Sequence, residues 1–155
     1  MSLASSASIT NQRLDAARRL IELAQSSDEA WLISSLENSA MFQLRSALNG
    51  LLQEVKLAYR LSGKLDIASL LREAQEKQSL VPVLIELNDL LQQASSWCSQ
   101  LISLYQQQLD CHMNQAAVDR TNLIGVGSDD SASLNLYLSK LTDLVLRFRE
   151  ESSEY

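Results

Sequence analysis

Two glutamates of this chain lie where an amphipathic helix should be apolar. Between residues 28 and 61 the sequence has one glycine and no proline, and its apolar residues recur at steps of three and four. This spacing places them on one side of a helix about 50 Å long. Glu37 and Glu54 fall within or beside that apolar stripe. Because a buried carboxylate is costly unless it is paired, the pattern predicts inward-facing carboxylates with cationic partners.

Partners for these carboxylates are expected close to the same apolar faces. Arg13 lies near the inner stripe of a helix predicted over residues 10–26, and Tyr59 lies off the centre of the stripe of 28–61. A tyrosine at such an edge can reach a polar partner with its hydroxyl group. We therefore predict an inward polar cluster of Arg13, Glu37, Glu54 and Tyr59. Two interpretations remain open: a small-molecule site inside a helical bundle, or arginine–glutamate pairs that fix the register of the helices.

The other chemistry-bearing residues do not form a known constellation. His112 is the single histidine, and the chain has no Glu-x-x-His motif, which excludes a di-iron carboxylate site. Its neighbours Asp110 and Cys111 point in other directions on a helix, and Cys98 is an expected core thiol. Residues 125–128 (GVGS) lack the preceding strand and following lysine of a phosphate-binding loop and are interpreted as a flexible turn. We expect no catalytic, cofactor-binding or metal-ligating residues, and hence no enzyme.

Composition excludes several classes of protein. Of 155 residues, 46% are hydrophobic, which indicates a globular chain, and 4 glycines with 1 proline are too few for the turns of a β-sandwich or barrel. The net charge of -6, with 13 scattered basic residues, argues against nucleic-acid and anionic-membrane partners. The start, MSLASSASIT, lacks the features of a secretory signal, and no apolar run could span a membrane. We expect a cytoplasmic protein with reduced thiols.

The periodicity predicts an all-α fold, namely an up-and-down four-helix bundle with one additional short helix. We expect a disordered segment 1–8 and a single helical domain over 9–151, with a long loop over 112–131. Gly63 is expected in the left-handed position after the second helix, and Asp66 is expected to cap the short one. The predicted helices are 10–26, 28–61, 67–77, 82–110 and 132–151.

The apolar face of the predicted helix 28–61 is wider than one neighbouring helix covers. Met41, Leu48 and Leu52 border its main stripe. Either a third helix or a second chain must pack there, so a homodimer is one expectation. We therefore predict a non-enzymatic interaction or scaffold protein that binds a second copy or another protein. The alternative is a small-ligand-binding bundle with a polar pocket near Glu54.

Several short motifs also resemble a known family. Residues 10–14 (TNQRL), 40–44 (AMFQL), 53–55 (QEV), 58–61 (AYRL) and 122–124 (NLI) resemble small uncharacterised proteins from Pseudomonas-like gammaproteobacteria, classed as a domain of unknown function. The resemblance implies an all-helical fold and brings no activity, cofactor or catalytic residue. The positions that it marks are Asn11, Gln12, Arg13, Glu54 and Tyr59.

Overall fold

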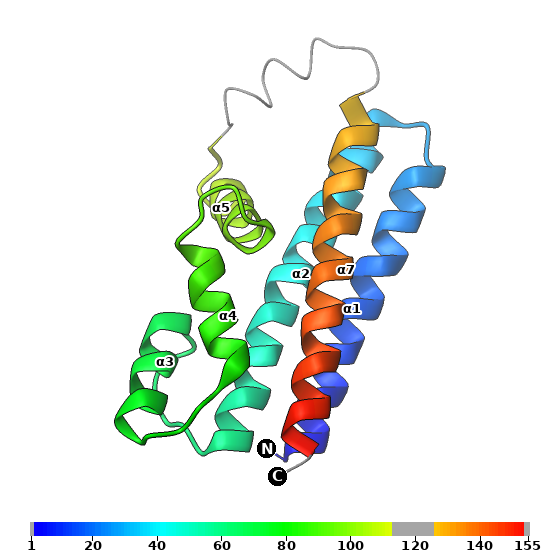
Figure 1. Cartoon of the computed structure of the whole chain (residues 1–155). Helices are drawn as coiled ribbons and strands as arrows, with labels where there is room; N and C mark the ends of the chain where they lie inside the picture. The colour runs from blue at the N-terminus through cyan, green and yellow to red at the C-terminus, as the bar shows by residue number, and fades with distance from the viewer. Residues whose placement is uncertain (1, 113–125, 154–155) are drawn as a thin grey trace.

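The computed structural model describes residues 2–112 and 126–153, and these residues form helices and connecting turns without a strand (Figure 1). The predicted all-α class is therefore confirmed for the described part of the chain. None of the described helices is long and apolar enough to cross a membrane. The helices are α1 (Leu3–Ser26), α2 (Ala30–Tyr59), α3 (Ile67–Glu76), α4 (Pro82–Leu91), α5 (Trp97–Leu109) and α7 (Val126–Ser153).

The three long helices α1, α2 and α7 pack side by side, and α5 packs on another side of α2 (Figure 1). Helix α4 lies against α5 and α7 and shares a core cluster with α2. Residues 27–29 are the whole connection between α1 and α2, and so short a loop makes the two helices antiparallel neighbours. The short helix α3 packs on α4, at the end of the molecule where α2 finishes. Helix α2 thus has neighbours on several sides, and the polar residues on its inner faces become buried.

The wide apolar face of α2 is filled within the chain. Met41, Leu48 and Leu52 are only 6%, 1% and 2% exposed. Leu48 and Leu52 belong to a core cluster that includes Leu84 of α4, while Met41 belongs to a second cluster with residues of α1, α5 and α7. The third-helix explanation therefore accounts for the width of this face, and the width does not require a second chain.

The N-terminal segment differs from the expectation. Helix α1 begins at Leu3 and not at Thr10, so the segment expected to be disordered is helical from Leu3 onward. Ser2 caps this helix, because its side chain accepts a hydrogen bond from the backbone N–H of Ser5. Ser6 and Thr10 are buried against the rest of the molecule. Small polar residues that suggest fraying in a sequence are here the residues that allow close helix packing.

The helix predicted over 82–110 is interrupted. Helix α4 ends at Leu91 and α5 starts at Trp97, and the two run in clearly different directions (Figure 1). Ser96 makes the break, because its hydroxyl group donates to the carbonyl oxygen of Leu90 at 2.6 Å and accepts from the N–H of Ser99 at 3.1 Å. The hydroxyl group of Ser99 donates to the same carbonyl at 3.0 Å. Serine side chains that bond to nearby backbone compete with continuous helix in this way.

The end of α2 and the start of α7 also differ from the prediction. The left-handed residue after α2 is Arg60, with φ 54°, and not Gly63. Helix α7 begins at Val126, so residues 126–131, expected at the end of a long loop and including part of the predicted flexible turn, are helical. The rest of that loop, residues 113–125, lies outside the described residues. The predicted Asp66 cap is confirmed, since its carboxylate accepts from the N–H of Ser69 at 2.9 Å.

Candidate functional site

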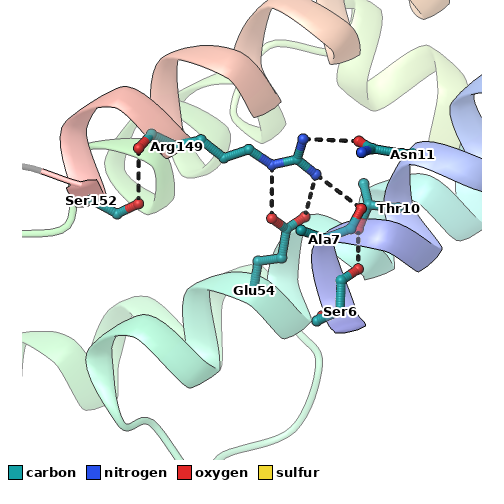
Figure 2. Close-up of polar contacts among 7 residues, drawn as sticks. All are labelled: Ser6, Ala7, Thr10, Asn11, Glu54, Arg149 and Ser152. Atoms are coloured by element: carbon teal, nitrogen blue, oxygen red, sulfur yellow. Dashed lines mark hydrogen bonds and ion pairs between the residues drawn. The ribbon is translucent and has the colours of Figure 1, made fainter. Parts of the chain in front are cut away.

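The most buried ionic contact of the described chain joins α2 to α7. The Nε of Arg149 donates to Oε1 of Glu54 at 2.9 Å, and Nη2 donates to Oε2 at 3.2 Å (Figure 2). The Glu54 side chain is 1% exposed and that of Arg149 is 27% exposed. Both carboxylate oxygens are thus engaged by one planar guanidinium group, the geometry that makes arginine–carboxylate pairs strong. Glu54 is an inward carboxylate, as its position in the stripe predicted.

The first turns of α1 complete this contact. Nη1 of Arg149 donates to Oδ1 of Asn11 at 2.8 Å, and Nη2 also donates to the carbonyl oxygen of Ala7 at 3.2 Å. Figure 2 shows the guanidinium group lying between the three helices, with Glu54 on one side and α1 on another. One arginine therefore connects α1, α2 and α7 at a single level of the fold.

A glycine lets α1 come close enough to take part. A Cβ atom at Gly50 would lie 2.6 Å from Oγ1 of Thr10 and 3.3 Å from its Cβ. Thr10 is fully buried, and its hydroxyl group donates to the carbonyl oxygen of Ser6 at 3.1 Å (Figure 2). The absence of a side chain at position 50 therefore sets the close approach of α1 to α2 one turn before Glu54.

The expected partner of Glu54, Arg13, contacts other residues. Its Nη1 lies 3.4 Å from Oε1 of Gln43, and its guanidinium carbon lies 6.0 Å from the centre of the Phe42 ring. That ring is in turn 6.4 Å from the ring of Tyr105 on α5. Arg13 therefore belongs to an outer edge where α1 and α5 flank α2, and the pairing with Glu54 that we expected is made by Arg149 instead.

The two other predicted residues lie elsewhere along α2. Glu37 is buried, but it precedes Glu54 by 17 residues, or about 25 Å along a helix axis. Tyr59 is partly buried, at the last residue of α2, and packs against the larger core cluster. Since 25 Å exceeds the reach of any side chain, the four predicted residues are distributed along the helices and do not make one pocket.

Comparison with known proteins identifies the family. A model of a family of unknown function (DUF6586) matches residues 1–155. The chain belongs to this family. No curated protein and no solved structure matches it. The resemblance to a family of unknown function is thereby confirmed over the whole chain. Of the positions that the resemblance marked, Asn11 and Glu54 meet at the Arg149 guanidinium group.

Sequence reasoning missed Arg149, although a signal was present. Arg149 follows Val145 by four residues and Leu141 by eight, and both of those residues are buried. It therefore continues an apolar stripe of α7 by one more turn. Two arginines so close together in a sequence, as Arg147 and Arg149 are, are typical of a solvated helix end. Arg147 fits that interpretation, since its side chain is 44% exposed, but Arg149 turns inward.

The remaining chemistry-bearing residues of this DUF6586 chain occupy separate surroundings. Burial raises the pKa of the Cys98 thiol from its ordinary 9.0 to about 11, while the nearby Arg45 lowers it less, so the thiol stays protonated near neutral pH. His112 and Asp110 line a shallow depression at the end of α5. Among the side chains that the structure describes, no three metal-ligating residues gather in one place. In the Glu54–Arg149 contact, both carboxylate oxygens of Glu54 accept hydrogen bonds from Arg149, and the contact connects helices.

Proposed function

We propose that this chain is a non-enzymatic interaction protein that binds a partner protein through an exposed apolar surface on α4. A shallow depression of about 400 Å³ lies there, and we refer to it as the α4 depression. Single exposed apolar side chains are ordinary on protein surfaces, whereas a contiguous apolar patch with a polar rim is typical of an interaction site. This contiguity is the observation that carries the proposal. The lining residues are Leu80, Pro82, Ile85, Glu86, Asp89 and Leu90.

The turn between α3 and α4 holds the patch in place. Leu80 is 74% exposed, while its neighbour Val81 is 1% exposed and anchors the turn in the core. On one side of them Gln78 has a left-handed backbone with φ 57°, and on the other Pro82 occupies the first turn of α4. A proline there presets the backbone angle, so Leu80 is displayed from a restrained turn. Presenting an apolar side chain in this way reduces the entropy lost on binding.

The architecture suits a scaffold. We infer an up-and-down four-helix bundle in which α1, α2 and α7 are three members and the interrupted pair α4–α5 forms the fourth. Helix α3 is then the additional short helix. The α4 depression faces away from α2, because Leu84 and Leu87 of the same helix are fully buried in the core. In this proposal the long helices, joined by the Glu54–Arg149 contact, form the support, and α4 carries the binding surface.

We place this function in the cytoplasm, because Cys98 and Cys111 are both free thiols. The partner is a second copy or another protein, and the net charge of -6 disfavours nucleic acid and anionic membranes. We do not propose a small-ligand site near Glu54. The Arg149 guanidinium group already occupies the place beside that carboxylate where a cationic ligand group would bind.

Photo-crosslinking in living cells tests this function. A photoreactive amino acid is placed at Leu80 or Ile85 in the α4 depression and, as the matched control, at the exposed Ser34 of α2. We expect a crosslinked product of discrete mass from the two α4 positions and none from position 34. The mass of the product distinguishes a second copy from another protein. The proposal fails if neither α4 position gives a discrete product, or if position 34 gives the same product.

A further inference from the structure

We propose that the α4 depression binds a segment of a different protein that carries an apolar anchor next to lysine or arginine. This inference rests on the proposed function and specifies the chemistry of the partner. The floor of the depression is apolar, formed by Leu80, Pro82, Ile85 and Leu90, and the two charged residues that line it, Glu86 and Asp89, are both acidic. An occupant must therefore supply apolar surface and complement negative charge.

The charge around the depression remains negative after its internal ion pairs are counted. Arg147 of α7 donates to both carboxylate oxygens of Glu86, at 2.8 and 2.9 Å, and to Asp143 at 3.0 Å. Asp89 forms no ion pair with any residue that the structure describes. Glu86 and Asp143 thus share the Arg147 guanidinium group, and Asp89 lies outside this ion-pair network. The three carboxylates and the one guanidinium group together carry two negative charges. The net charge of the whole chain, -6, has the same sign.

This charge favours a different protein over a second copy. In a two-fold symmetric dimer the same patch faces itself, so Asp89 and its neighbours would meet the carboxylates of the second copy. Like charges brought together at an interface oppose association, whereas basic side chains at the rim would attract and orient the partner. The small volume of the depression, about 400 Å³, suits a few side chains of a short segment, which inserts its apolar residue between Leu80 and Ile85.

Selection from a random peptide display library against the full-length chain tests this inference. A Leu80→Ser/Ile85→Ser double variant serves for counter-selection, and binding of one enriched peptide is then measured by fluorescence anisotropy. We expect enriched peptides to combine an aliphatic or aromatic residue with lysine or arginine. The double variant should weaken binding about tenfold or more, as loss of a central apolar anchor does. Asp89→Asn should weaken it about two- to fivefold, and added salt should do the same.

Leu23→Ser is the matched control, because Leu23 is 55% exposed on α1, outside the depression. It should leave peptide binding unchanged, and circular dichroism verifies that all variants are folded. The inference is overturned if no peptide is enriched, if the enriched peptides are acidic, or if they bind the double variant equally well. It also fails if light scattering shows a dimer that Leu80→Ser/Ile85→Ser abolishes. In that last case a crosslink from Ile85 still supports the proposed function, whereas the absence of any crosslink removes both.

Discussion

Two arginines of α7, two residues apart, make chemically similar pairs in different surroundings. Arg149 binds Glu54, whose side chain is 1% exposed, and Arg147 binds Glu86, whose side chain is 41% exposed. Each pair has two guanidinium–carboxylate hydrogen bonds. At the exposed pair water screens the charges and can replace the lost partner, while at Glu54 it cannot. Solvent access, more than bond geometry, therefore decides how much each pair matters to stability.

We expect Arg149→Ala to lower the free energy of unfolding by about 3–5 kcal/mol, because it leaves Glu54 buried without its counter-charge. The matched variant Arg147→Ala should cost no more than about 1 kcal/mol. Urea unfolding of both variants measures the difference. Equal losses would show that the Glu54 carboxylate is not held in a dry environment. The double variant Glu54→Leu/Arg149→Met should recover most of the stability, since it removes both charges together.

Of the two residues of this ion pair, Glu54 was predictable from the sequence and its partner was not. The helical spacing of α2 identified Glu54, because a carboxylate between Leu51 and Val55 interrupts an otherwise apolar stripe. Its partner could not be chosen by the same argument, since several arginines lie near helix stripes and spacing along one helix does not say which other helix faces it. The choice of Arg149 over Arg13 depends on how α7 lies against α2.

At the scale of helices, periodicity was reliable for faces and unreliable for boundaries. The apolar repeat Leu84, Leu87, Leu91, Ala94, Cys98, Leu101 continues through the break between α4 and α5, so the repeat alone predicted one helix. The break is determined instead by the hydroxyl group of Ser96, which bonds to the Leu90 carbonyl oxygen and caps α5, so that helical hydrogen bonding does not continue. The same limitation applied to α1, whose serine-rich start was expected to be disordered and is helical.

We expect Ser96→Ala to lower the free energy of unfolding by about 1 kcal/mol, because it removes the N-cap of α5 and a hydrogen bond to the Leu90 carbonyl group. Ser95 is the matched control: it precedes Ser96, it is exposed, and its replacement by alanine should change stability by less than about 0.5 kcal/mol. Thermal and urea unfolding compare the two. If Ser95→Ala and Ser96→Ala behave alike, the hydroxyl group of Ser96 does not determine the break.

At the scale of the whole molecule, stability depends on pH through the core. Cys98 lies in the larger core cluster and is fully buried, and burial raises its thiol pKa to about 11. The unfolded chain loses this proton near its ordinary pKa of 9.0, whereas the folded chain keeps it to higher pH. The stabilising contribution of the neutral thiol is therefore complete below pH 9 and is lost as the pH rises toward 11.

Urea unfolding of the wild-type chain and of Cys98→Ala at several pH values measures this contribution. The difference in stability between the two proteins should be constant up to about pH 8 and should decrease between pH 9 and 11. Cys111→Ala provides the control, because Cys111 is exposed. A difference for Cys98→Ala that does not vary with pH would contradict a raised thiol pKa.

The separation of Glu54 and Arg149 along the chain also has a consequence for synthesis. The two residues are 95 positions apart. A ribosome that adds about 5–20 residues per second needs roughly 5 to 20 seconds to pass from one to the other. During that interval the nascent hairpin of α1 and α2 carries a carboxylate that must stay hydrated or take up a proton. We expect the hairpin to close around a charged Glu54 only after translation of α7, so that a translational pause before α7 would prolong exposure of the hairpin to chaperones and proteases.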